Sequence, residues 1–269
     1  MISALILTYN EENILQRCID SLDFVDELII FDSFSTDSTE KIARKNNANF
    51  KQRKFDNFAA QRNAGLKSIN PKSDWILMVD ADEIITMELK NELLQSVKLN
   101  SDISLFKVRR KDMFMGKWIK HSSGYPTWFP RFFKNHRVTV EREINEEYIT
   151  TGKTKNLKNH LIHYPFNKGL QYWFTKHNIY SDLEASKMIS EMKEKINITD
   201  LFSKDPSTRR KTYKRMSYKF PFRPTIVFLI FYIVNGGFMD GKEGYEFCRL
   251  RKIYESMIDI KLNSVKKSI

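Results

Sequence analysis

The stretch from Asp74 to Glu83 constrains the fold of this chain more than any other. The apolar run 75–79 has the length typical of a strand that is buried on both faces. Three carboxylates, those of Asp80, Asp82 and Glu83, follow it directly. The carboxyl end of a buried parallel strand lies at the rim of its sheet, where open α/β sheets bind ligands. The sequence therefore predicts a ligand site at the end of this strand.

Asp80 and Asp82 stand two positions apart. In extended backbone, side chains at this spacing point the same way, so the two carboxylates are expected to share one hard divalent cation and the phosphates it neutralises. An alternative is that Asp82 and Glu83 cap the helix predicted at 86–100, because acidic residues are common before helices. Both interpretations stay open at this point.

The first hundred residues alternate between predicted strands and helices. The strands are expected at 2–7, 27–31, 49–51 and 75–79, and the helices at 14–22, 39–46 and 57–68. This alternation favours an α/β fold with a mostly parallel sheet flanked by helices. Polar residues follow three of the strands, at 8–11, at 32 and at 80–82, so we expect them to meet at one rim.

No glycine-rich loop is available to bind phosphate. Neither G-x-G-x-x-G nor G-x-x-x-x-G-K-[ST] occurs in the chain, which argues against a classical dinucleotide site and against a P-loop. Phosphate charge would then be met by a metal ion and by basic side chains such as Arg62. The alternative for Arg62 is a position on a solvated helix face.

The end of the chain is strongly basic. The protein has 269 residues and a net charge of +12, and residues 201–269 hold 15 Lys and Arg against 6 Asp and Glu. Such a tail fits nucleic acid or an anionic membrane surface. We expect no nucleic-acid partner, because no recognised binding motif accompanies the charge.

An apolar run, 226–234, follows the basic part of this tail. Nine residues are too few to cross a bilayer, which needs about twenty, but they can lie in its surface. The alternatives are a helix packed on the α/β domain and a homo-oligomer interface. The stretch 2–7 is too short for an export signal, and Cys18 and Cys248 form no disulfide framework. We therefore expect a cytoplasmic protein, peripheral on the inner face of the cytoplasmic membrane.

Four motifs in the first ninety residues resemble glycosyltransferase family 2, the inverting enzymes of GT-A fold. They are LTYNEE at 7–12, IFDSFSTDST at 30–39, QRN at 61–63 and WILMVDADE at 75–83. Softer motifs, PRFF at 130–133, LKNHLIHY at 157–164 and GFMDG at 237–241, resemble the bacterial lipopolysaccharide-core and capsule β-glucosyltransferases. Together the resemblance covers about the whole chain.

The resemblance implies a domain organisation and an activity. A GT-A catalytic domain would span 1–200, with a nucleotide-sugar-binding half at 1–100 and an acceptor half at 101–200, and a basic helical extension would span 201–269. The enzyme would move a hexose, expected to be glucose from UDP-glucose, onto a lipopolysaccharide-core, capsule or other lipid-linked glycan acceptor. It would use Mg²⁺ or Mn²⁺, which stabilises the leaving nucleoside diphosphate.

The resemblance also implies site residues by position. The donor would be bound by Thr8, Tyr9, Glu11, Asp32, Arg62, Asp80, Ala81 and Asp82. Among these, Asp80 would also take part in catalysis by holding the sugar, and Asp82 is the expected metal ligand. His163 is a second candidate ligand, with a purely structural role as its alternative. Arg131 would face the diphosphate or acceptor, or else form a surface ion pair.

Inversion by single displacement needs a general base for the acceptor hydroxyl. The resemblance places it in the acidic segment 141–147, where Glu146 is the expected base and Glu147 and Glu143 are alternatives. The subgroup often has a His directly before the acid, and this chain has Asn145 there. A solvated acidic turn is the other interpretation.

Two rival functions are considered. A phosphatase of the haloacid-dehalogenase type also uses Asp-x-Asp at a strand end, but on the first strand and with a later acidic pair, and this chain has no Asp-Asp. A non-catalytic, membrane-associated module that binds sugar nucleotides would keep the pocket and lack a working base.

Overall fold

The computed structural model describes residues 1–99, 102–141, 147–193, 197, 199–200, 212, 215–218, 220 and 222–267. The chain forms two compact units, each described here by itself. The first comprises Met1–Met113 and Tyr125–Asn167, and the second comprises Phe114–Gly124 and Lys168–Ile269. The second unit thus begins before the domain boundary expected at residue 200, and the division of function between the two parts stays a prediction.

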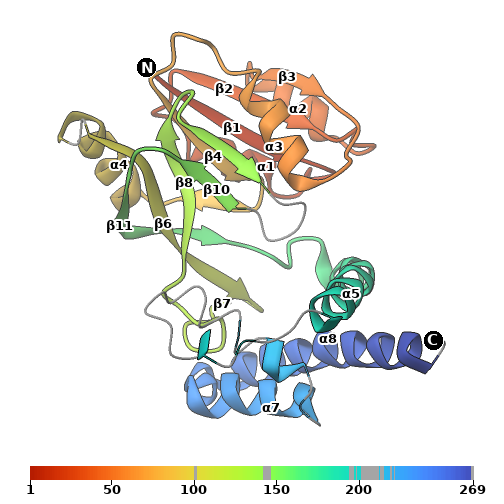
Figure 1. Cartoon of the computed structure of the whole chain (residues 1–269). Helices are drawn as coiled ribbons and strands as arrows, with labels where there is room; N and C mark the ends of the chain where they lie inside the picture. Colours follow the sequence, from red (N-terminus) through yellow and green to blue (C-terminus); the bar gives the residue numbers. More distant parts are fainter. Residues whose placement is uncertain are drawn as a thin grey trace. The chain divides into compact units, whose positions relative to one another are not determined.

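The first unit is an α/β structure around one large sheet (Figure 1). Its strands are β1 (Ile2–Thr8), β2 (Glu27–Asp32), β3 (Asn49–Gln52), β4 (Trp75–Asp80), β5 (Glu83–Ile85), β6 (Ile103–Phe114), β8 (Trp128–Lys134), β9 (Val138–Glu141), β10 (Glu147–Thr150) and β11 (Lys153–His163). Its helices are α1 (Leu15–Asp20), α2 (Thr39–Lys45), α3 (Phe58–Leu66) and α4 (Met87–Leu99). The α/β class is confirmed, and the predicted elements before residue 100 form within a few residues of their expected bounds.

The large sheet has the order β3-β2-β1-β4-β8-β6-β11-β5. β1 runs parallel to β2 and to β4, and β2 runs parallel to β3. Beyond β4 the sheet is mixed, because β8 is antiparallel to β4 and to β6 while β11 is parallel to β6. β9 and β10 pair separately as an antiparallel hairpin.

The alternation of side chains along β4 explains why both faces of the sheet are covered. Trp75, Leu77 and Val79 belong to one core, with residues of α1, α2 and α4. Ile76 and Met78 point to the opposite core, with residues of α3, β9 and β10. A strand that is apolar at every position must be buried on both faces, and covering helices hold its carboxyl end in place at the rim.

The second unit is mostly helical. It contains β7 (Lys117–Trp118), α5 (Gly169–Lys193), α7 (Arg223–Leu229), the π-helix η2 (Ile230–Val234), the 3-10 helix η3 (Gly237–Asp240) and α8 (Gly241–Lys267). α5 and α8 share a small core that includes Ala185, Met188, Ile258 and Leu262. The predicted C-terminal helices are therefore present in the described part of the tail.

The described helices differ from membrane-spanning helices in length and composition. No single one is both long and apolar enough to cross a bilayer, and the segments Arg223–Val234 and Gly237–Ser264 pass only when joined as a pair bent by 70°.

Candidate active site

The carboxyl ends of β1, β2 and β4 meet at one rim of the sheet, as the sequence predicts. Thr8 is the register partner of Asp32 on β2, and Leu7 is the partner of Asp80 on β4. This rim brings the polar residues that follow the three strands into one region of the first unit.

Asp32 is buried and is held by hydrogen bonds from its own chain. Thr8 Oγ1 donates to its Oδ1 at 2.8 Å, the Ser35 N–H donates to its Oδ2 at 2.8 Å, and Gln52 Nε2 donates to Oδ2 at 3.2 Å. These contacts fix the turn after β2. Binding of a base or ribose by Thr8 and Asp32 stays a prediction.

The segment after β1 is more open. The Tyr9 side chain is exposed, whereas Glu11 is half-buried and accepts a hydrogen bond from Asn167 Nδ2 at 2.9 Å. Asn10 between them has a φ of 54°, a conformation that Asn tolerates better than most residues. Tyr9 and Glu11 thus lie at the predicted rim, and their contact with a donor stays a prediction.

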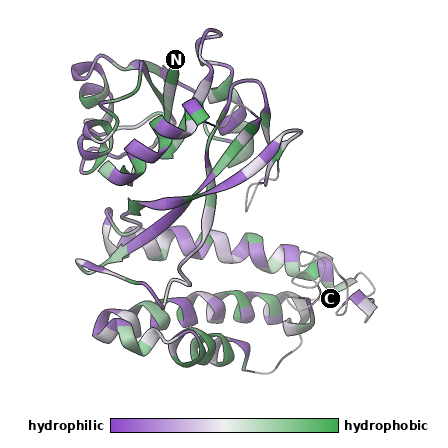
Figure 2. Ribbon diagram, turned by 90° about the vertical axis from the view of Figure 1, so that its left-hand side faces the viewer, coloured by the Kyte–Doolittle hydropathy of each residue, from purple (hydrophilic) through white to green (hydrophobic). Residues whose placement is uncertain are grey.

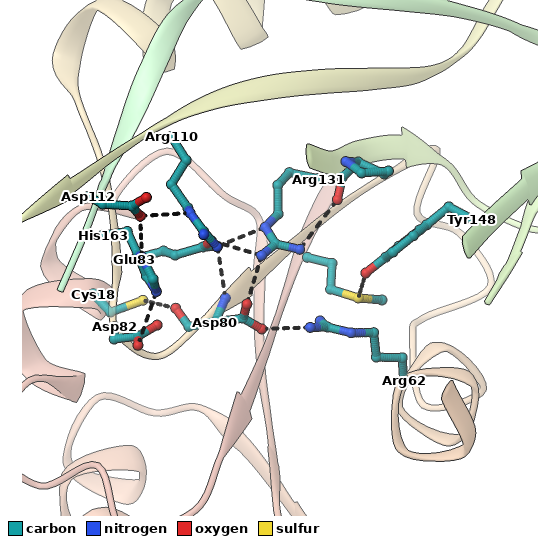
Figure 3. Close-up of polar contacts among 12 residues, drawn as sticks. Cys18, Arg62, Asp80, Asp82, Glu83, Arg110, Asp112, Arg131, Tyr148 and His163 are labelled. Atoms are coloured by element: carbon teal, nitrogen blue, oxygen red, sulfur yellow. Dashed lines mark hydrogen bonds and ion pairs between the residues drawn. The ribbon is translucent and has the colours of Figure 1, made fainter. Parts of the chain in front are cut away.

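Asp80 lies between two arginines (Figure 3). Arg62 Nη2 donates to Oδ1 at 2.9 Å and Arg131 Nη2 donates to Oδ2 at 2.7 Å. Burial alone would raise the pKa of Asp80, but the charges of Arg131 and Arg62 outweigh it and hold this pKa well below its usual range. Asp80 is therefore a permanent carboxylate. Arg62 is buried on α3, so the interpretation of a solvated helix face is wrong.

Arg131 forms a buried fork with Glu83. Its Nε and Nη2 donate to the two carboxylate oxygens of Glu83, each at 2.8 Å, and both side chains are buried. Burial opposes the charged guanidinium, yet Asp80 and Glu83 raise the pKa of Arg131 well above its usual value. The expectation of a surface ion pair for Arg131 is wrong.

The capping interpretation of the acidic residues is also wrong for α4. Thr86 Oγ1 accepts the N–H of Leu89 at 3.2 Å, so Thr86 caps this helix. Glu83 instead begins β5 and anchors Arg131. A threonine satisfies an N-terminal N–H in the same way as a carboxylate does, which leaves Asp82 and Glu83 available for other contacts.

Asp82 does not follow the direction of Asp80. It lies in the turn between β4 and β5, where strand alternation no longer applies, and Ala81 between the two is buried. Asp82 Oδ2 is 3.4 Å from His163 Nε2, and Nδ1 of the same ring is 2.6 Å from Asp112 Oδ1. The two aspartates at the end of β4 thus contact different partners.

His163 lies between two carboxylates at the end of β11. Burial lowers its pKa, but Asp82 and Asp112 more than offset this and raise it to about 9. Arg110 also forms an ion pair with Asp112, with Nε 2.9 Å from the same Oδ1. Asp112 and Arg110 were missed by sequence reasoning, because only the pairing of β6 with β11, which puts Asp112 opposite His163, brings them to this region.

Asp82 and His163 are the two residues at this rim that could bind the predicted divalent cation. The described residues contain no group of three or more His, Cys, Asp or Glu side chains that could hold a metal ion. Two ligands of one cation bonded at about 2.1 Å lie roughly 3.0–3.4 Å apart, and Asp82 Oδ2 and His163 Nε2 match this separation. An Asp112 carboxylate on Nδ1 is also the usual way to aim Nε2 at a metal. Nε2 of His163 would have to lose its proton to bind a cation, because metal ligands are deprotonated. With that proton released, the pair fits a cation that takes its remaining ligands from phosphate and water.

The predicted general base lies outside the described residues, as do all of 142–146, including Glu143. Glu147 is described: it begins β10, its side chain is exposed, and it lies opposite Glu141 of β9 in the strand register.

Asn63 on α3 holds the neighbouring strand β9. Its side-chain amide accepts a hydrogen bond from the Val140 N–H at 3.0 Å and donates one to the Val140 carbonyl at 2.7 Å. Adjacent residues of the QRN motif therefore hold Asp80 and the β9 strand.

Comparison with known proteins gives related sequences over most of the chain. The model of the family described as glycosyl transferase family 2 matches residues 3–161. The lipopolysaccharide core biosynthesis glycosyltransferase LpsC of Rhizobium meliloti is 26% identical, and the match covers 94% of this chain and 92% of that protein. An uncharacterized glycosyltransferase of Rickettsia felis is 30% identical, with 73% of each chain covered.

Among solved structures, this chain is similar to glucosyl-3-phosphoglycerate synthase from Mycobacterium tuberculosis in complex with Mn²⁺ and UDP-glucose. The identity is 26%, the TM-score is 0.36, and the match covers 41% of this chain and 44% of that one. The family match itself runs from the second residue of β1 through β4 and reaches into β11, and so includes the rim with Asp80 and Asp82. The chain therefore belongs to glycosyl transferase family 2 and is a glycosyltransferase.

Proposed function

We propose that this glycosyltransferase moves glucose from UDP-glucose, with inversion, onto a lipopolysaccharide-core acceptor. The similarity to LpsC, a lipopolysaccharide core glycosyltransferase, over nearly the full length of both chains supports this acceptor. A capsule or another lipid-linked glycan is the second choice. The donor rests on the resemblance of the motifs at 130–133, 157–164 and 237–241 to those of the bacterial β-glucosyltransferases.

The pairing of Asp82 with His163 at the rim is the observation that carries the proposal. Oδ2 and Nε2 lie 3.4 Å apart, beside the carboxylate of Asp80 and next to the ends of β1 and β2. A divalent cation held by these two residues would supply positive charge to the diphosphate as it leaves. Asp112 would keep the His163 ring oriented for this contact.

Asp80 is proposed to accept a hydrogen bond from a hydroxyl of the donor sugar. Its side chain is 29% exposed, and each carboxylate oxygen can accept a second hydrogen bond besides that from its arginine. Because its pKa is far below neutrality, it is a weak base. Proton removal from the acceptor is therefore assigned to Glu146, as the sequence predicts.

The buried charges around Asp80 suit an anionic donor. Arg62 and Arg131 carry two positive charges, and Asp80 and Glu83 carry two negative ones, so the cluster of four is neutral overall. A carboxylate compensated in this way repels a diphosphate much less than an isolated one would. Asp80 can thus lie beside the donor phosphates while it keeps its charge.

The test is a transfer assay with the purified chain. UDP-glucose, a truncated lipopolysaccharide acceptor and Mn²⁺ should give a glucosylated product whose new linkage is β, as read from the proton coupling of the anomeric carbon by NMR. GDP-mannose and UDP-galactose should react more slowly. Asp82→Asn should abolish transfer, whereas Asp23→Asn, an exposed aspartate paired with Lys90, should not. Transfer with retention, or full activity of Asp82→Asn, would contradict the proposal.

A further inference from the structure

The second unit carries an exposed apolar surface that its own core does not use. It is formed by Phe222, directly before α7, and by side chains of α7, η2 and η3, with exposed fractions between 37% and 81%. We name it the α7–η3 patch: Phe222, Ile226, Leu229, Ile230, Ile233, Val234, Phe238 and Met239. The ribbon of α7 and η2 is coloured as mainly hydrophobic in Figure 2. A patch of this kind marks an interaction site, because soluble surfaces seldom gather so many large apolar side chains.

The patch is one face of a helix whose other face is already packed. Ile226, Ile230 and Ile233 recur at helical spacing on the exposed side. On the opposite side, Phe228 and Tyr232 contact Tyr245 of α8, with ring centroids 6.0 and 5.6 Å apart. The helix is therefore apolar all round, with α8 covering only half of it.

No charge interrupts the patch. Residues 224–239 contain neither Asp, Glu, Lys nor Arg. Arg223, at the start of α7, is turned inward and pairs with the buried Glu255, with Nη1 2.6 Å from Oε2. Asp240, at the end of η3, is buried and accepts the N–H groups of His121 and Ser122. The charges at both ends are thus withdrawn from the exposed face.

Basic residues of α8 lie close to the apolar helix. Arg251, whose guanidinium carbon is 5.6 Å from the ring centroid of Phe231, and Arg249 are about half exposed although they pair with Glu255 and Glu246, and Lys242 at the start of α8 is exposed. Lys117 Nζ donates to the Asp240 carbonyl, which brings another cation next to η3. In the sequence, the run 209–219, which is separated from α7 by three residues, holds six Lys and Arg and no acid.

We propose that the α7–η3 patch lies in the interfacial region of an anionic lipid bilayer. The segment Arg223–Val234 is roughly 18 Å long at helical rise, shorter than a bilayer core of about 30 Å. Apolar side chains next to basic residues are typical of helices that lie in the membrane surface. A second copy of this chain fits less well as the partner, because it would bring the basic residues of two copies close together. The inference does not depend on the proposed donor or acceptor.

The experiment is flotation of the full chain with vesicles. Phosphatidylethanolamine vesicles with phosphatidylglycerol should bind the wild type, pure phosphatidylcholine vesicles should bind it at least ten-fold more weakly, and added salt should weaken binding. Phe222→Asn, Ile233→Gln and Val234→Gln together should weaken binding at least ten-fold. Asn suits position 222, where φ is 56°, so this variant is expected to fold, which circular dichroism checks.

A matched control alters three exposed apolar residues elsewhere in the same unit. Ile179→Gln, Leu183→Gln and Ile260→Gln together should leave binding unchanged. As a second readout, a polarity-sensitive dye on Ile233→Cys should shift to the blue with anionic vesicles, and the same dye on Ile260→Cys should not. Equal binding by the two triple variants would overturn the inference. The inference would also be overturned if the wild type were a dimer that bound no vesicles and the triple variant of the patch were a monomer.

Discussion

Asp112 Oδ1 lies 2.6 Å from Nδ1 of His163, although 51 positions separate the two residues in the sequence. The contact joins the carboxyl ends of the parallel strands β6 and β11, and Nε2 of His163 then points toward Asp82. A positioning residue of this kind sets the orientation of a ligand without touching the metal.

Asp112→Asn should weaken Mn²⁺ binding in the presence of UDP by roughly 10- to 100-fold, the usual cost of losing such a partner. Asparagine keeps the size of the side chain but loses the charge that orients the imidazole. Titration calorimetry measures the affinity directly, and Asp23→Asn serves as the control. An unchanged affinity for Mn²⁺ would show that Asp112 does not position His163.

Glu83→Gln should strongly destabilise the first unit. The substitution replaces one of the two carboxylates on the buried Arg131 guanidinium with a neutral amide and leaves Asp80 as its remaining charged partner. Breaking a buried ion pair costs up to about 3–5 kcal/mol, and the contact with Asp80 should keep the loss toward the lower end. Urea unfolding followed by circular dichroism measures the loss. Asp23→Asn, which breaks an exposed pair with Lys90, should change the free energy of unfolding little. If both variants were equally stable, the buried fork would not support the fold.

Glu146→Gln should lower kcat by roughly 10²- to 10⁴-fold, as expected when a general base is removed. The affinity for UDP should not change, since the base contacts the acceptor. Glu143→Gln and Glu147→Gln are the matched variants and should keep most of the activity. A larger loss in either of them would move the base there, and normal turnover in all three would favour the interpretation of a solvated acidic turn.

His177 should make the second unit less stable in mild acid. Burial, with added repulsion from Lys176 and Arg251, lowers its pKa from 6.5 to about 4 despite a hydrogen bond to the Trp173 carbonyl. The unfolded chain then binds this proton more readily, so stability is lost as the pH falls from about 6.5 to about 4. His177→Phe keeps the stacking on Trp173, whose ring centroid is 3.8 Å away, and should remove this part of the pH dependence. An NMR titration of His177 with a midpoint above 6 would contradict the account.

The half of the site that lies on β1, β2 and β4 could be predicted because it depends on local pattern. Each strand is a short apolar run, and parallel pairing of the strands brings Thr8, Asp32 and Asp80 to one rim of the sheet. This placement does not depend on the conformation of the loops. The likeness of the motifs to family 2 predicted the family, which the family match confirms, and the finer chemistry stays a prediction.

The partners of these residues could not be predicted, since they depend on pairings distant in sequence. Asp80 meets Arg131 only because β8 lies beside β4, and His163 meets Asp112 only because β11 lies beside β6. Neither pairing leaves a periodic signal. The expectation that Asp80 and Asp82 point the same way failed for a different reason, because the strand ends at Asp80 and Asp82 lies in a turn.

The most direct test of the central claim, that Asp82 and His163 hold the cation that binds the donor diphosphate, is calorimetric titration of the full chain with UDP. It is done with and without Mn²⁺ on the wild type, on Asp82→Asn and on Asp23→Asn. The account predicts binding that requires Mn²⁺, is lost in Asp82→Asn and is kept in Asp23→Asn. Binding of UDP that is equally strong without Mn²⁺, or that survives in Asp82→Asn, would contradict it.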